Sequence, residues 1–372
     1  MKFTCEKFLL LATIITASRA TSSKSPVPLL EGLMLVAEDN YIRISAYDLK
    51  TGIVTEMPAD VEEGGGVVLN ARLFGEIIRK APGQYVTITS NSGYVVMITS
   101  ELSEFEILGS PPSDFPELPT VEGLDSLEIK ESLLKKMISQ TNFAVSDIES
   151  RPIYTGALFE TKGNELTIVA VDGFRLALRR EKLDNEDTQT LSFVVPGSAL
   201  TEVERIISDG DNIVTITLGS KHIMFTIGET MLVSRRLEGE FLNYKTSIPQ
   251  SSKYQLIIDK EEFIASVERV ALIISDKLKS PVRCTFGENS IKLTTASELG
   301  KASDECSMEG NGDDVEMGFN DRYLLEALRA APVGKLKLEL TTGNTPCLLT
   351  SVDNEEDFTY MILPVRLKTY DN

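Results

Sequence analysis

Apolar and polar residues alternate along much of this chain in short runs that predict β-strands. A period of two places one face of a strand on a core and the other in water. Residues 41–46, 165–170 and 290–295 show this pattern, and each segment follows another apolar strand after a short turn. Amphipathic segments with a helical period lie between these strand pairs. The pattern predicts an α+β fold with antiparallel strands joined by tight turns.

The pattern also recurs along the chain. A short strand runs into an amphipathic helix at residues 1–10, 127–138 and 254–267, a spacing of about 125 residues. This spacing is far longer than the period of a solenoid repeat and indicates tandem domains. We predict three domains, called copies below, at residues 1–121, 127–248 and 252–372, with linkers near 119–127 and 248–253.

A second strand-to-helix unit recurs near the middle of each copy. Asn70, Ser198 and Asn320 stand at its strand-to-helix junctions. Their side chains can accept hydrogen bonds from the free amides of a first helical turn, which predicts that they are N-caps. Each copy should therefore hold two helices and two small antiparallel sheets.

The first residues allow another interpretation. The apolar run at residues 8–17 and the small residues after it resemble a secretory signal peptide. Glu6 lies where such a leader is basic, and Arg19 interrupts the cleavage motif. The run is too short to span a membrane. Because the segment recurs in the other copies, we interpret it as part of the first domain.

The distribution of charge along the chain bears on whether it binds nucleic acid. The chain has 56 acidic and 37 basic residues, a net charge of −19, and such a balance normally argues against nucleic-acid binding. However, the predicted helices at 70–80 and 130–140 each carry three basic residues and one acidic residue. Lys24 and Arg151 lie in the loops that follow the first helices of the first and central copies. These cations form either a basic surface or ordinary solvated helix faces.

The sequence gives little support for a catalytic site. The one histidine, His222, lies in an alternating strand, which favours a structural role. The four cysteines are widely spaced, as expected for reduced thiols and not for a metal site. Acidic clusters at 209–211 and 311–314 are typical of turns. A carboxylate-dependent hydrolase using them is the alternative enzyme hypothesis, and a peptide-binding scaffold unrelated to DNA is a third.

Two further segments suggest binding. A turn at Asp172-Gly173 in the central copy should present Phe174, Arg175 and Leu176. The apolar run at residues 360–367 forms either a buried last strand or part of a partner-binding groove. Proline at position 364 should end strand pairing there and leave residues 365–367 free to line a surface.

Several motifs in this order resemble the bacterial DNA polymerase III beta subunits, the replicative sliding clamps, over essentially the whole chain. The motifs are Met1-Lys-Phe-Thr, Lys24-Ser-Pro-Val-Pro-Leu-Leu, Asp114-Phe-Pro-Glu-Leu, Gly156-Ala-Leu-Phe-Glu, Asp172-Gly-Phe-Arg-Leu-Ala, Gly318-Phe-Asn and Leu363-Pro-Val-Arg-Leu.

The resemblance implies a non-catalytic, cytoplasmic protein associated with the nucleoid, without a metal or a cofactor. Two chains would form a head-to-tail homodimer, a closed ring whose helices face duplex DNA and bind it without sequence preference. The resemblance places DNA contacts at Lys24, Arg72, Lys80 and Arg151. It places the dimer interface at Phe105 and Ile107 of one subunit and Leu272 and Ile273 of the next.

The resemblance also implies a pocket for short apolar peptides of the replicative polymerase, the clamp loader, ligase and repair polymerases. The pocket residues are Tyr154, Val171, Gly173, Phe174, Arg175, Leu176, Leu242, Leu278, Asn320, Tyr323, Leu363, Pro364, Val365, Arg366 and Leu367. Val171, Phe174 and Leu242 depart from the residues common in the family and should make this pocket more apolar.

Overall fold

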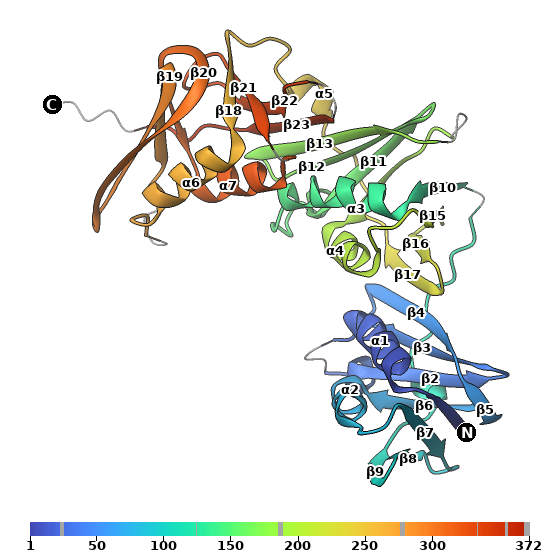
Figure 1. Ribbon diagram of the computed structural model, residues 1–372. Coiled ribbons are helices and arrows are strands. Elements are labelled where there is room, and N and C mark those ends of the chain that lie inside the picture. Colours follow the sequence, from blue (N-terminus) through green and yellow to red (C-terminus); the bar gives the residue numbers. More distant parts are fainter. Residues whose placement is uncertain are drawn as a thin grey trace. The chain divides into compact units, whose positions relative to one another are not determined.

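A computed structural model of the chain describes residues 1–22, 26–123, 125–184, 189–275, 280–332, 334–353 and 356–367. Its elements follow the threefold repeat (Figure 1). The chain divides into two compact units, each described by itself below: residues 1–135 with 201–236, and residues 136–200 with 237–372.

The first copy begins with a strand that leads directly into a helix, as the alternation predicts. Leu10, Ile14 and Ala17 of that helix are buried. The elements are β1 (Lys2–Glu6), α1 (Lys7–Ala17), β2 (Gly32–Glu38), β3 (Tyr41–Tyr47), β4 (Thr51–Pro58), β5 (Asp60–Glu63), β6 (Gly65–Asn70), α2 (Ala71–Lys80), β7 (Tyr85–Ser90), β8 (Val95–Ser100) and β9 (Ser103–Leu108).

The central copy repeats this order. Its elements are β10 (Asp125–Lys130), α3 (Glu131–Ser139), the 3₁₀ turns η4 (Asn142–Ala144) and η5 (Pro152–Thr155), β11 (Gly156–Lys162), β12 (Glu165–Val171), β13 (Arg175–Lys182), β14 (Ser192–Pro196), α4 (Gly197–Ile206), β15 (Ile213–Leu218), β16 (His222–Ile227), β17 (Thr230–Arg235) and the short α5 (Tyr244–Ser247).

The last copy contains a long hairpin in place of several short strands. Its elements are β18 (Tyr254–Asp259), α6 (Lys260–Ala271), β19 (Val282–Ser297), β20 (Gly300–Phe319), α7 (Asp321–Ala330), β21 (Lys335–Leu340), β22 (Cys347–Ser351) and β23 (Asp357–Ile362). Strands β19 and β20 pair along most of their length, with irregular register near Phe286 and Ser290.

The strands of neighbouring copies join into continuous sheets. In the first unit, β17 of the central copy pairs with β4 of the first copy, which completes an eight-stranded sheet. In the second unit, β13 pairs with β23, from Arg175 opposite Ile362 to Arg180 opposite Asp357, within a ten-stranded sheet (Figure 1). A five-stranded sheet, β5-β1-β7-β8-β9, belongs to the first copy. The eight-stranded and ten-stranded sheets are thus shared between copies, in contrast to the small separate sheets expected for each copy.

Two of the three predicted N-caps are confirmed. The side chain of Asn70 accepts a hydrogen bond from the amide of Leu73, and that of Asn320 accepts one from the amide of Tyr323. The prediction for Ser198 is wrong, because α4 already begins at Gly197 and Ser198 lies inside its first turn. Directly before α4, Pro196 ends β14 and supplies no side-chain acceptor.

The four cysteines are free and buried, as predicted for reduced thiols. Burial raises the pKa of the Cys5 thiol to about 12. The predicted end of pairing in the C-terminal run is also observed, since β23 stops at Ile362, two residues before Pro364. Pairing resumes at one point, however, where the amide of Val365 donates to the carbonyl of Gly318 at 2.8 Å.

Candidate functional site

The turn between β12 and β13 in the second unit is held by its aspartate. One carboxylate oxygen of Asp172 accepts hydrogen bonds from the amides of Phe174, at 2.8 Å, and Arg175, at 3.0 Å. Gly173 occupies the left-handed region, with φ of 93°, which a side chain would disfavour. This short-range geometry explains the Asp-Gly pair and fixes where Phe174 leaves the turn.

Arg175 is the most engaged side chain near the turn. Its Nε donates to Asp172 Oδ2 at 2.9 Å, one terminal nitrogen donates to Glu326 of α7, and the other donates to the carbonyl of Phe143 in η4 at 2.7 Å. The guanidinium also lies over the ring of Tyr323, 4.4 Å from its centroid. Only 5% of Arg175 is exposed. It therefore connects the turn to η4 and α7.

The charges around Arg175 shift the pKa of its partner. Burial by itself would raise the pKa of the Glu326 carboxyl. Hydrogen bonds from Arg322 and Arg175 outweigh that effect, so the pKa lies below its ordinary value. Glu326 is thus held ionised at neutral pH and gives Arg175 a charged acceptor.

Phe174 is the side chain of the turn that reaches solvent. It is 54% exposed, and its ring stacks on that of Tyr323 with centroids 6.0 Å apart and planes 25° apart. The Phe174 carbonyl accepts a hydrogen bond from the amide of Leu363 at 2.8 Å. The turn, the first turn of α7 and the segment after β23 therefore meet around one exposed aromatic ring.

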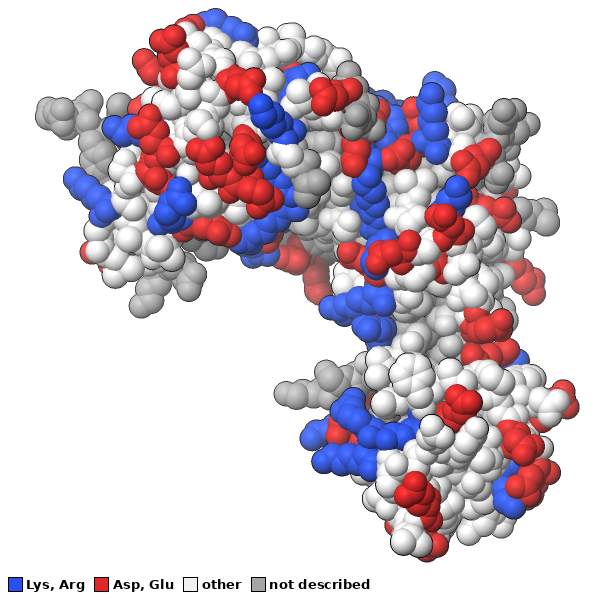
Figure 2. All heavy atoms as spheres, in the orientation of Figure 1, with Lys and Arg blue, Asp and Glu red and all other residues white. Residues whose placement is uncertain are grey.

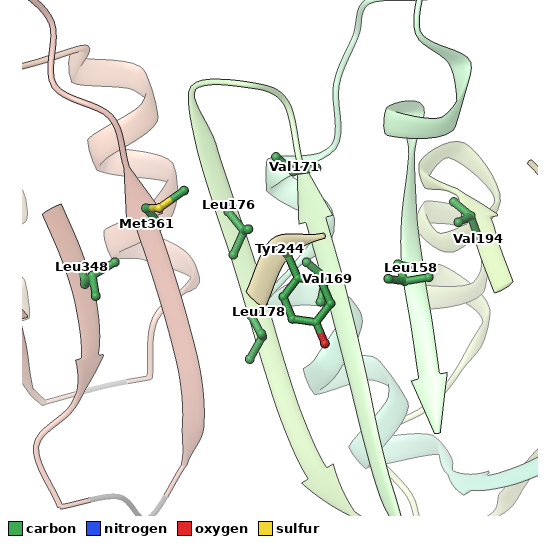
Figure 3. Close-up of a cluster of buried hydrophobic side chains, with 9 residues drawn as sticks. All are labelled: Leu158, Val169, Val171, Leu176, Leu178, Val194, Tyr244, Leu348 and Met361. Carbon is green, nitrogen blue, oxygen red and sulfur yellow. The ribbon is translucent and has the colours of Figure 1, made fainter. Parts of the chain in front are cut away.

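An apolar cluster lies beneath this surface. It contains Leu158, Val169, Val171, Leu176, Leu178, Val194, Tyr244, Leu348 and Met361. In Figure 3, Tyr244 lies across β12 and β13 while Met361 extends from β23 beside Leu176. Ile153, Tyr154, Leu237, Phe241 and Ile248 pack against the cluster and are only partly buried.

The predicted pocket residues thus have different positions. Val171 and Leu176 are buried in the apolar cluster, and Tyr154 packs against it, with its ring meeting that of Phe241 edge to face at 5.6 Å. Of the three side chains that the turn was expected to present, Phe174 alone is exposed. Leu242 is 37% exposed.

The segment after β23 completes this region. Val365 and Arg366 are exposed, while Leu363, Pro364 and Leu367 are half-buried. The amide of Tyr323 is capped by Asn320, so both belong to the start of α7. Leu278 lies outside the described residues.

Sequence reasoning missed several members of this region. Phe143 and Glu326 hold Arg175, Met361 belongs to the apolar cluster, and Phe241 and Ile248 pack against that cluster. Met361 could have been found, because it lies in the apolar run at residues 360–367. Nothing in the sequence pairs Phe143 or Glu326 with Arg175.

The predicted DNA contacts differ in availability. On α2, Arg72 and Lys80 are exposed, and no ion pair joins either of them to another described residue. Figure 2 shows basic side chains gathered over α2. Arg151, before η5, is also exposed. Lys24 lies outside the described residues.

The basic residues of α3 are used differently. Lys135 pairs with Asp209 at 2.8 Å in the first unit, and Lys136 pairs with Glu356 in the second. The equal charge balance of the two helices in the sequence therefore does not give equal basic surfaces.

The predicted interface residues lie at exposed edges of their own units. Phe105 and Ile107 are half-buried on β9, an outer strand of the five-stranded sheet, next to the exposed Leu108. Leu272, directly after α6, is 82% exposed, and Ile273 is half-buried.

The described residues contain no His, Cys, Asp and Glu grouping that could hold a metal ion. Within the same ranges, no helix has the length and apolar character needed to cross a membrane. The acidic cluster at 311–314 lies inside β20 and not in a turn between elements: its pairing with β19 is irregular there, and the Asn311 side chain accepts a hydrogen bond from the amide of Asp313. In the other cluster, Asp209 pairs with Lys135.

Comparisons with known proteins agree along the whole chain. Family models match the N-terminal domain of the DNA polymerase III beta subunit at residues 1–119, its central domain at 128–243 and its C-terminal domain at 245–366. The beta sliding clamp of Bacillus subtilis is 31% identical, over 98% of this chain and all of the relative.

The chain belongs to the DNA polymerase III beta subunit family. The crystal structure of the Bacillus subtilis sliding clamp has a TM-score of 0.93, with 31% identity over 99% of this chain and 100% of that one. A Pseudomonas aeruginosa sliding clamp solved with bound griselimycin has the same TM-score at 26% identity, over 99% of this chain and 100% of that one. Three tandem sliding-clamp domains are thereby confirmed.

Sliding clamps of this family are processivity subunits of DNA polymerase III and catalyse no reaction. As a member, this chain is a non-catalytic processivity clamp. The carboxylate-dependent hydrolase and the scaffold unrelated to DNA are set aside on this ground.

Proposed function

We propose that two copies of this chain close head-to-tail into a ring that encircles duplex DNA and tethers the replicative polymerase. The observation that carries the proposal is the match to sliding clamps along the whole chain, in sequence and in fold. Such a ring would work in the cytoplasm at the nucleoid, where the replicated DNA lies.

The ring would close through two apolar edges. Phe105 and Ile107 on an outer strand supply one, and Leu272 with Ile273 supplies the other. An outer strand has unpaired backbone groups that can continue a sheet in another subunit. Because the two edges differ, the contact is heterologous and generates a ring when the rotation closes.

The DNA contacts would be made by Arg72 and Lys80 of α2, Arg151 and Lys24. Exposed cations such as Arg72 and Lys80, which form no ion pair with a described residue, can release counterions from phosphates, and such contacts carry no sequence information. An acidic chain with a small basic surface would hold DNA weakly, which permits sliding.

The partner site would lie around Phe174. We propose that a short apolar peptide of the polymerase, the clamp loader, ligase or a repair polymerase contacts Phe174, Tyr154, Leu242 and the segment from Leu363 to Leu367. Exposed apolar side chains above a packed floor are the usual anchors of peptide interfaces. Val171, Gly173, Leu176, Asn320 and Tyr323 would form the floor and frame, Arg175 would hold them in place, and Leu278 completes the proposed set.

Retention on DNA tests the ring directly. The purified protein is placed on nicked circular DNA by a clamp loader and passed through a sizing column. We expect it to remain with the circle and to leave after a restriction enzyme linearises the DNA. A strictly monomeric protein at micromolar concentration, or equal retention on circular and linear DNA, would refute the proposal.

A further inference from the structure

A surface hollow in the first unit lies between α1 and the segment that follows α2. Its volume is about 480 Å³. Phe8 and Leu11 of α1 line one side, and Pro82, Gln84 and Tyr85 line the other. Phe8 is 78% exposed and Tyr85 is 58% exposed. Two aromatic rings thus border one hollow with much of their surface in solvent.

The two sides of the hollow are fixed to each other by Lys7. Its amide donates to the carbonyl of Gln84 at 2.8 Å, and its side chain donates to the carbonyl of Ala81. Burial of Leu10 and Ile14 anchors the remainder of α1 on the core. The two backbone segments that carry the rings are therefore held in place before a ligand binds.

The charge around the hollow is basic although the chain is acidic. Lys80 ends α2 two residues before Pro82, and Lys7 lines the hollow. The carboxylate among the lining residues is that of Glu6. Lys80 pairs with no described residue. A ligand with planar apolar groups and negative charges would complement this surface.

We propose that this hollow binds an unpaired stretch of DNA, with a base stacked on Phe8 beside Tyr85 and the adjoining phosphate near Lys80. Exposed aromatic rings beside cations form the platform that binds single strands without sequence preference. The inference rests on the proposed function, since α2 is the helix assigned to DNA. It adds a contact to single-stranded DNA that a fully paired duplex cannot make, because its bases remain stacked on one another.

Fluorescence anisotropy with a dye-labelled thymidine homopolymer and a hairpin duplex tests the inference. We expect Phe8→Ala to weaken binding of the homopolymer by about tenfold, since stacking contributes about 1–3 kcal/mol per base. Duplex binding should not change. Phe8→Tyr, which keeps the ring, should bind as the wild type does.

Ile15→Ala is the matched control, because Ile15 is exposed on the same helix but does not line the hollow. Phe8 is exposed, so Phe8→Ala should unfold at the wild-type denaturant concentration. Equal homopolymer binding by wild type and Phe8→Ala would overturn the inference, as would displacement of the homopolymer by an acidic aromatic peptide that binds more tightly. Neither result would affect retention of the protein on circular duplex DNA, so the retention experiment tests the proposed ring independently of this inference.

Discussion

Two regions of the protein differ in the surroundings of their basic side chains. The cation at the turn around Arg175 is buried and bonded, whereas those of α2 face solvent. Arg175 is almost fully buried and donates to three acceptors from three segments. Arg72 and Lys80 are exposed and have no ion pair with a described residue. The comparison shows that the partners of a cation within the fold decide whether it shapes a site or is available to bind phosphate.

The largest expected effect follows from removing Arg175. Arg175→Met would leave Asp172 and Glu326 without their shared cation, and breaking such a buried pair costs about 3 kcal/mol of unfolding free energy. Binding of a clamp-docking peptide should fall as well, because Phe174 loses its fixed position. Urea unfolding and peptide titration measure the two effects.

Phe174→Ala, in the same turn, should separate the effect on stability from the effect on peptide binding. Its ring is half in solvent, so stability should change little while peptide binding and polymerase stimulation are lost and dimerisation stays intact. For Arg175→Met, unfolding at the same urea concentration as the wild type would contradict the role of Arg175 in connecting the turn to η4 and α7.

A smaller effect is expected on α2. Replacing Arg72 and Lys80 together with glutamine should reduce the slope of log affinity for duplex DNA against log salt by about 2, since each phosphate contact contributes about 0.9. Stability should not change. The matched control replaces Lys135 and Lys136 of α3, which are paired with Asp209 and Glu356. If both double variants changed the slope equally, the two helices would not differ as their ion pairs indicate.

The smallest effect concerns pH. The pKa of Glu326 is lowered in the folded protein, so its ionised form stabilises the fold at pH values above 4.5, its ordinary pKa. That contribution is lost as the pH falls through the lowered value. The stability difference between wild type and Glu326→Gln should therefore be constant near neutral pH and shrink below about pH 4.5. Urea unfolding across this range measures it, and a difference independent of pH would contradict the role given to Glu326.

The sequence predicted local features well. Strand alternation, helix periods and the caps at Asn70 and Asn320 depend on residues a few positions apart. Long-range features were not predictable in this way. Glu326 and Phe143 lie 151 and 32 residues from Arg175, so no local pattern shows that the arginine is buried. The Asp172-Gly173 pair located the turn, but the contacts showed that Phe174 is its exposed side chain.

The pairing of β4 with β17 and of β13 with β23 has a consequence for how the chain can be divided. Cutting at the linkers would leave the central copy with two bare strand edges, each a template for aggregation. Pulling neighbouring copies apart would require rows of backbone hydrogen bonds to break together. The paired strands therefore resist separation of neighbouring copies, and they connect these copies more strongly than the peptide linkers do.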